Sequence, residues 1–249
     1  MAARPGRVVA AGALLPDSLS LSKRPTLSVV VPVLNEAAGL DEFLSKLMQR
    51  LPENTEVVVV DGGSEDGSWD IAQSHPVKLI QCSAGRARQM NEGAALVESE
   101  YLMFLHADTE LPESFADDFV WWVSAQPVWG FSSLHLTGAQ WWCRLVEFGI
   151  NMRTRITSGA SGDQAQIVKT SYFRSLGGFA DIALMEDIAL SYRLRRRWPA
   201  RRFPNSVLTS SRRWRQGGVV KTVLLMWFLR SSYRLGVSPQ RLAHWYRGA

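Results

Sequence analysis

The sequence predicts an α/β fold in which a mostly parallel central sheet carries helices on both faces. Strand-length runs rich in valine, leucine and isoleucine occur at 27–34, 56–61, 77–82 and 101–105. The runs are apolar almost throughout, as expected for strands covered on both faces. Helix-forming segments separate them, and this alternation of strand and helix is typical of a parallel, helix-covered sheet.

The connecting segments support this order. A helix is expected at 37–51, where leucines and Phe43 recur at helical spacing. After the second strand, which ends in Asp61, a Gly/Ser turn leads into a short helix through Ala72. The segment GRARQMNEGAALV (85–97) is predicted to be a loop entering a helix.

The second half of the chain has a different character. WGFSSLHLTG (129–138) alternates loosely, which is typical of an edge or antiparallel strand. The remaining expected elements are a helix at 140–155, a Gly/Ser loop at 158–164, a helix at 186–197 and short strands around RRFP and SVLTS. They predict a small antiparallel part on one side of the sheet. No linker separates the halves, so we expect one domain over 27–249, divided at about residue 110.

Composition narrows the function. The 249 residues are 46% hydrophobic and 20% charged, which is ordinary for a globular chain. The net charge of +5 is uneven, with arginines crowded between Arg193 and Arg215, and this favours an anionic partner. Nucleic acid is not expected, because RNA-binding signatures and Cys/His finger spacings are absent from the sequence. Cys82 and Cys143 have no metal or redox spacing, which indicates a reduced, cytoplasmic chain.

Two further segments bear on membranes. Residues 1–26 resemble a signal peptide only superficially and are expected to be a flexible extension. VVKTVLLMWFLRSSYRLGV (219–237) is too short and too charged to predict a transmembrane helix with any force. We expect a core helix there, with an interfacial helix as the alternative. Peripheral contact with the inner membrane face and a homodimer both stay open.

Carboxylates follow the buried strands where ligands bind in open α/β sheets, at the carboxyl ends. Asp61 follows the second strand, Asp108 follows the fourth, and the pair Glu186-Asp187 opens a later helix. Two acids suited to a nucleotide and its metal, with a later acid suited to proton abstraction, favour group transfer from an activated donor.

Several motifs in order resemble family 2 glycosyltransferases of GT-A fold over residues 27–245: VVVPVLNE, VVVVDGGSEDG, GRARQMN, FLHADT, GDQA and LMEDIALSYRLRRR. The last of these, followed by TSSRRW, resembles a small bacterial subgroup associated with radical-SAM and selenodomain proteins. The resemblance implies a Rossmann-like GT-A domain whose residues 27–110 bind the nucleotide and whose residues 111–249 bind the acceptor.

The resemblance assigns nucleotide contacts to the first half. Each assigned residue also has a local structural explanation: helix capping for Asn35, an Asx turn for Asp61 and a solvated charge for Arg86. The residues expected near the nucleoside or the diphosphate are Pro32, Asn35, Glu36, Asp61, Gly62, Arg86 and Asn91.

His106-Ala107-Asp108 stands where the family usually has Asp-x-Asp. The resemblance makes Asp108 a ligand of Mn²⁺ or Mg²⁺, which bridges the donor phosphates and neutralises the leaving diphosphate. His106 replaces the first acid; it is expected to contact ribose or phosphate, to become a second ligand, or to serve the structure alone.

On the acceptor side, the resemblance makes Asp187 the base that takes the proton from the acceptor hydroxyl, with Glu186 orienting the acceptor or the metal shell. Asp163 and Gln164 are candidates for binding a sugar hydroxyl, against a simple tight turn. Arg212 or Arg213 is expected to clamp the diphosphate, and Trp214 to stack on a sugar ring. Ser210 and Ser211 replace the Gln-x-x of processive synthases, which disfavours processive synthesis.

The sequence therefore predicts an inverting, metal-assisted glycosyltransferase of hexosyl or related groups, with a nucleotide-diphosphate sugar donor, most simply UDP-linked, and an unidentified hydroxyl acceptor. One alternative is a non-catalytic nucleotide- or sugar-binding protein of the same fold. A nucleotidyltransferase is disfavoured, because PVLNEAAGL lacks the Gly-rich loop with a basic residue that such enzymes carry after the first strand.

Overall fold

A computed structural model describes residues 8–10 and 26–248 of the chain. Helices and strands alternate along the first half, as the sequence predicts. The elements of this half are β1 (Val8–Ala10), β2 (Leu27–Val33), α1 (Ala37–Arg50), β3 (Glu56–Asp61), α2 (Ser68–Gln73), β4 (Lys78–Gln81), α3 (Arg86–Ala95) and β5 (Tyr101–Phe104). The predicted extension at 1–26 lies outside the described residues, apart from the three of β1 and Thr26.

The second half supplies short strands and most of the long helices. Its elements are β6 (Thr109–Glu110), α4 (Phe115–Ser124), β7 (Trp129–Leu136), α5 (Trp141–Thr157), the 3₁₀ turn η1 (Gly162–Gln164), β8 (Gln166–Lys169), α6 (Thr170–Ser175), α7 (Glu186–Arg195), β9 (Arg201–Thr209), α8 (Arg212–Gly217), α9 (Val219–Arg234) and α10 (Pro239–Arg247). RRFP and SVLTS form one strand, β9, instead of two.

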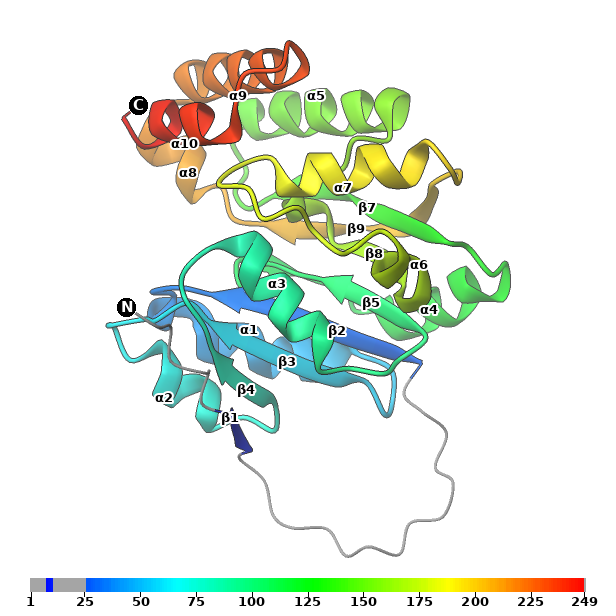
Figure 1. The fold of residues 1–249 in the computed structure, drawn as a ribbon. Coiled ribbons are helices and arrows are strands. Elements are labelled where there is room, and N and C mark those ends of the chain that lie inside the picture. The colour runs from blue at the N-terminus through cyan, green and yellow to red at the C-terminus, as the bar shows by residue number, and fades with distance from the viewer. Residues whose placement is uncertain (1–7, 11–25, 249) are drawn as a thin grey trace, which may run out of the picture.

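The described strands form one sheet in the order β1-β4-β3-β2-β5-β8-β7-β9-β6 (Figure 1). Strands β4, β3, β2 and β5 are parallel, and β8 then runs antiparallel to both β5 and β7. This agrees with the predicted parallel sheet and its small antiparallel part. Of the two alternatives for 129–138, the antiparallel one is confirmed by pairing with β8, and the edge one is wrong, because β9 pairs in parallel with the other side of β7.

Both faces of the sheet are covered, which explains why its central strands are apolar throughout. Val29, Val31 and Val33 pack with residues of α1, α4 and α5, whereas Val30 packs with α3, α6 and α7 on the opposite face. All four valines are essentially inaccessible to solvent. Alternate side chains of one strand therefore anchor the two helical layers (Figure 1).

Helices α8, α9 and α10 form a further layer beyond α7, next to α5 (Figure 1). Leu229 of α9 and Leu242 of α10 pack with Met185 and Ile188 at the start of α7. The expectation of a core helix at 219–237 is wrong, because α9 leaves large apolar side chains such as Trp227 in solvent. No helix in the described ranges combines the length and the apolar character needed to cross a membrane.

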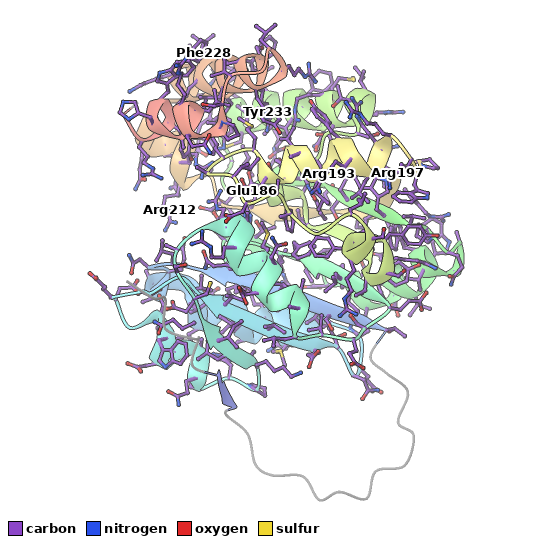
Figure 2. All side chains as sticks on the ribbon, in the orientation of Figure 1. Glu186, Arg193, Arg197, Arg212, Phe228 and Tyr233 are labelled. Carbon is purple, nitrogen blue, oxygen red and sulfur yellow. The ribbon has the colours of Figure 1, made fainter. Side chains whose placement is uncertain are left out.

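The arginines of α7 also differ from the simple expectation of a solvated face. Arg193 is partly buried and donates hydrogen bonds to the carbonyl oxygens of Leu176 and Gly178. Arg195 donates to the carbonyl oxygen of Thr157. Figure 2 shows Arg197 just beyond the end of α7, where its side chain is exposed. Part of the arginine run thus fastens neighbouring loops.

Candidate active site

Two turns meet at the carboxyl edge of β2 and β3. The backbone N–H of Asn35 donates to Ser64 Oγ (2.9 Å), and Asn35 Oδ1 accepts from the N–H of Glu65 (2.9 Å). The N–H of Glu36 donates to Ser68 Oγ (2.9 Å). Asn35 has the left-handed φ of 55°, which asparagine tolerates better than most residues. It does not cap α1; Glu36 occupies that position without a capping side-chain bond.

The carboxylate of Asp61 is occupied by its own turn. It is 1% exposed, and Oδ2 accepts from the N–H groups of Gly63 (2.8 Å) and Ser64 (2.9 Å). Oδ2 also accepts from Gln81 Nε2 at 3.2 Å. The Asx-turn explanation therefore holds, while the predicted contact between Asp61 and a base stays a prediction.

Gln89 is a buried polar residue whose role the sequence argument missed. Its Nε2 donates to the carbonyl oxygens of Val33 (2.9 Å) and Val60 (2.8 Å), where β2 and β3 end. A Cβ on Gly62 would lie 3.2 Å from the Gln89 amide. Gly62 thus makes room for this bridge. A glutamine on the apolar face of the predicted helix at 85–97 was the available signal.

His106, Asp108 and Asp163 form the group of side chains in the described chain that fits a metal ion. One ligand atom from each lies within 4.8 Å of the others, and His106 Nδ1 is 3.1 Å from Asp163 Oδ1. Imidazole with two carboxylates suits a divalent transition metal such as Mn²⁺. Asp108 therefore lies where the predicted ligand should be, and His106 and Asp163 join it. Asp163 had been assigned to the acceptor instead.

Gly162 holds this cluster against the acid pair of α7. A Cβ on Gly162 would meet the His106 ring at 2.4 Å, so a larger residue has no space. The N–H of Gly162 donates to Asp187 Oδ2 (2.7 Å). Through one glycine, the strand end that carries His106 contacts the helix start that carries Asp187.

The acid pair begins α7 after Met185, whose φ of 72° is unusual for a residue with a side chain. Asp187 Oδ1 accepts from the N–H of Ile188 (2.6 Å), so both of its oxygens are oriented by backbone groups. Glu186 is 6% exposed, and burial together with the neighbouring Asp187 raises its pKa to about 7. Glu186 therefore titrates near neutral pH.

Arg86 faces this acidic centre from the start of α3. Its surroundings disfavour charge, yet the carboxylates of Asp163, Glu186 and Asp187 outweigh that effect and raise its pKa. The pKa of Asp163 lies far below its ordinary value; burial opposes this, but the bond from His106 and the charges of Arg213 and Arg86 prevail. Arg86 is solvent-accessible, since it lines the cavity described below.

The predicted arginine–tryptophan motif begins α8. Arg212 forms an exposed ion pair with Glu36 (3.2 Å), so it reaches the turn after β2. Arg213 lies over the ring of Tyr246, 5.6 Å from its centroid. Trp214 is partly buried against the core. Figure 2 places Arg212 and Glu186 at the level where the sheet meets the α8–α10 layer.

One cavity of about 1600 Å³ reaches the His106–Asp108–Asp163 cluster, Arg86 and the start of α8, whereas Glu186 and Asp187 are not among its lining residues. Of the predicted site residues, it is lined by Arg86, His106, Asp108, Asp163, Arg212, Arg213 and Trp214. The cavity continues between α5 and α9, where apolar side chains line it. It also contains Arg153 and Arg230, which the sequence argument did not single out.

Three predicted contacts are used by the fold itself. The amide of Asn91 exchanges two hydrogen bonds of 2.9 Å with the backbone of Phe179. Gln164 is fully buried, donates to the carbonyl oxygen of Ser132 and accepts from Thr154 Oγ1. Pro32 pairs within the sheet, opposite Val60. None of the three lines the cavity.

Comparison with known proteins shows which families and structures this chain resembles. Residues 28–128 match the model for glycosyl transferase family 2. The succinoglycan biosynthesis protein ExoA of Rhizobium meliloti is 29% identical over 193 residues, covering 67% of this chain and 57% of the relative. A PGL/p-HBAD biosynthesis glycosyltransferase of Mycobacterium bovis is 34% identical over 97 residues, covering 36% of this chain and 38% of the relative. The chain thus spans little more than half of the first relative and less of the second.

Solved structures agree on the fold. The S. aureus TarS structure with UDP-GlcNAc has a TM-score of 0.62 at 18% identity, covering 75% of this chain and 59% of TarS. The Pyrobaculum calidifontis mannosyltransferase PcManGT, in complex with GDP-Man and Mn²⁺, has a TM-score of 0.61 at 22% identity, covering 90% and 69%. The predicted GT-A fold is confirmed, and the comparisons support the predicted glycosyltransferase class. They do not support the radical-SAM/selenodomain subgroup.

Proposed function

We propose that this protein is an inverting, metal-assisted glycosyltransferase that transfers a sugar from a nucleotide-diphosphate donor to an acceptor hydroxyl. The observation that carries the proposal is the contact, through Gly162, between the His106–Asp108–Asp163 cluster and the acid pair Glu186-Asp187. A single-displacement transfer needs a diphosphate site and a proton acceptor side by side.

The donor site lies at the carboxyl edge of β2, β3 and β5. Asp61, Gly62 and the turn at 35–37 would hold the nucleoside, and Glu36 fixes Arg212 beside that turn. Arg86 and Arg212 bring positive charge to the side where a diphosphate would lie. His106, Asp108 and Asp163 are the residues that would hold a divalent cation, which supplies Lewis-acid neutralisation of the leaving diphosphate when bound.

Proton transfer is assigned to Asp187. Two backbone N–H groups, from Gly162 and Ile188, orient its carboxylate. The acceptor oxygen would attack the anomeric carbon as its proton passes to Asp187, and the bond to the diphosphate oxygen breaks on the opposite face. No covalent intermediate on the protein is needed. With its pKa raised to about 7, Glu186 is protonated in part of the molecules near neutral pH, and in that form it would donate a hydrogen bond to acceptor or donor.

The donor would be UDP-linked if the Asp61 turn reads uracil as the resemblance implies. Neighbours of this fold bind UDP-GlcNAc in TarS and GDP-Man with Mn²⁺ in PcManGT, so the fold accommodates either base. The predicted cytoplasmic location and a peripheral membrane contact belong to this proposal as well.

The test is thermal stabilisation by a panel of nucleotide diphosphates with and without Mn²⁺ or Mg²⁺. A ligand at a hundred times its Kd stabilises the fold by about 2.7 kcal/mol. We expect the largest shift with UDP plus metal, and loss of the metal-dependent part in Asp108→Ala. The exposed Asp117 on α4 provides the matched control, Asp117→Ala. A folded protein that responds to no nucleotide would refute the site, whereas a preference for GDP would refute only the uridine assignment.

A further inference from the structure

Two helices present apolar stripes to the cavity. On α5, exposed apolar side chains recur every three or four residues and so share one helix face: Trp141, Leu145, Phe148, Met152 and Ile156. On α9 the matching residues are Val220, Leu224 and Trp227, each more than 60% exposed. All eight line the same cavity, and we call this part of it the apolar groove.

The apolar groove is continuous with the candidate active site, because His106, Asp108 and Asp163 line the same cavity. Figure 2 shows Phe228 on the outer side of the α8–α10 layer, whereas Glu186 lies on the inner side of that layer, near the sheet. A ligand with one polar end and one apolar end would span both environments.

Arginines lie at the junction of the two environments. Arg153 comes from α5 and Arg230 from α9, and both line the cavity. Nη1 of Arg153 donates to the carbonyl oxygen of Gly159 (2.7 Å), but its Nε and Nη2 are buried without a hydrogen-bond partner. Within the described residues, Arg230 has no hydrogen bond or ion pair. Buried donors that the protein leaves unpaired are costly, and a bound anion relieves that cost.

Electrostatics agrees with this geometry. Burial lowers the pKa of Arg153 to about 9, and the charge of Arg230 contributes in the same direction. Burial also lowers the pKa of Arg230, although Asp187 and Asp163 act against it. Two guanidinium groups therefore disfavour one another at the inner end of an apolar groove. A phosphate between them would compensate both, since arginine pairs strongly with phosphate oxygens.

We propose that the acceptor is a lipid phosphate: its phosphate binds between Arg153 and Arg230, and its hydrocarbon chain lies in the apolar groove. The acceptor hydroxyl of the proposed reaction is then the P–OH group of the phosphate monoester: its oxygen forms the bond to the anomeric carbon, its proton passes to Asp187, and the nucleoside diphosphate leaves. This inference rests on the proposed glycosyl transfer, because it places the acceptor's polar end beside Asp187. The arginines select this occupant over a second copy of the chain or a bare membrane surface. Both alternatives would cover the apolar stripes but would leave Nε and Nη2 of Arg153, and the guanidinium group of Arg230, without a partner among the described residues.

Decyl phosphate is the probe that tests the site, with decanol and inorganic phosphate as its two halves. Binding to the full-length protein is followed by tryptophan fluorescence, because Trp141, Trp142 and Trp227 line the cavity. We expect decyl phosphate to bind saturably and at least about tenfold more tightly than either half, a difference equivalent to about 1.4 kcal/mol.

Two variants distinguish the contact with the phosphate from the contact with the hydrocarbon chain. Arg230→Gln should weaken decyl phosphate by about tenfold and leave decanol unchanged, because only the anion contacts the guanidinium. Leu224→Asn should weaken both chain-bearing probes. The controls are Arg202→Gln and Val120→Asn, exposed residues of β9 and α4 that do not line the cavity. Neither control should change binding of any probe.

Four results would overturn the proposal. Equal affinity for decanol and decyl phosphate would remove the anion site. Loss of metal-dependent UDP binding in Arg230→Gln would assign the arginine to the donor instead. A dimer in sedimentation that Leu224→Asn dissociates would make the groove a subunit interface. Binding to anionic phospholipid vesicles that is unchanged in Arg230→Gln would make the groove a membrane-binding surface.

One further outcome concerns the proposed function alone. A protein that binds decyl phosphate but no nucleotide would refute the glycosyltransferase proposal and keep the amphiphile site.

Discussion

The hydrogen bonding of polar side chains differs between two regions: the turns at the ends of β2 and β3, and the helices around the apolar groove. In the turns, Asp61 and Asn35 bond to neighbouring backbone groups, and Gln89 of α3 bridges the ends of the two strands. At the apolar groove, Nε and Nη2 of Arg153 are buried without a hydrogen-bond partner in the described part of the chain. The other buried unpaired side-chain atoms in the described structure belong to Gln166, Thr170 and Arg193, which do not line the cavity.

The polar groups of the turns are thus hydrogen-bonded within the protein, whereas part of the polar groups at the apolar groove is left for a ligand to pair. Hydrogen bonds within the protein fix the turns on the nucleotide side before a donor binds. This is the preorganisation that a binding site needs. Within the described residues, the acceptor side keeps guanidinium N–H groups without a partner on Arg153 and Arg230, together with exposed apolar side chains, and an acceptor would cover both. The predictions below probe this contrast, beginning with the junction of the two regions.

The largest effect is expected at Asp187, which joins both regions. Asp187→Asn keeps an oxygen to accept a backbone N–H but removes the proton acceptor, so the transfer rate should fall by about 10²–10⁴-fold. The measurement is single-turnover release of the nucleoside diphosphate from the donor. Metal-dependent nucleotide binding should persist in the same variant. Full activity in Asp187→Asn would move the base elsewhere, with Glu186 as the nearest candidate.

Glu186 tests whether the junction carries a buried acid. Burial and Asp187 raise its pKa from 4.5 to about 7, so the folded protein binds this proton more tightly than the unfolded chain. That stabilisation is complete below pH 4.5 and is lost as the pH rises through about 7. Glu186→Gln mimics the protonated form and should lack this loss.

The measurement is the Tm of both proteins from about pH 5 to about pH 8, in a chelator that keeps the cation site empty. Wild type should lose on the order of 3 kcal/mol at most relative to Glu186→Gln over that range. A constant difference between the two proteins would show that Glu186 does not titrate in this range, and the raised pKa would be refuted.

Gly162 tests the contact between the cluster and the acid pair. Gly162→Ala would place a Cβ 2.4 Å from the His106 ring, so the ring or the η1 turn must move. Overpacking of this kind costs about 1–3 kcal/mol, and Mn²⁺ binding should weaken with it. Gly39→Ala on α1 is the matched control, because nothing lies within 4 Å of its added Cβ. Unchanged Mn²⁺ binding in Gly162→Ala would separate the cluster from this loop.

The nucleotide half was predictable because its signals are local. The strand at 27–33 and the turn that follows Asp61 can be recognised from consecutive residues. Asp108 could also be placed, since it follows a buried strand. The role of Gln89 was missed, although it too lies within one helix, because its partners Val33 and Val60 come from two strands distant in sequence.

The acceptor half was less predictable because its features depend on distant packing. Asp163 joins His106 only after η1 folds against the end of β5, across a separation of 57 residues. The apolar character of α9 predicts burial, yet Trp227 is 71% exposed, since the helix packs on α7 and α10 through one narrow face. Which arginine lacks a partner cannot be seen in a run of arginines.

The smallest effect is expected for the exposed ion pair that links α8 to the turn after β2. Arg212 and Glu36 are 3.2 Å apart, with 52% and 30% of their side chains exposed. Water and salt screen such a pair, so Arg212→Ala should lower the free energy of unfolding by less than about 1 kcal/mol in urea denaturation. The same variant should weaken nucleoside diphosphate binding. Glu36→Gln should not weaken it, because that variant keeps the positive charge of Arg212. Equal nucleotide affinity in Arg212→Ala and wild type would limit Arg212 to tethering α8 to the turn after β2, and Arg86 would then be the arginine left to face the diphosphate.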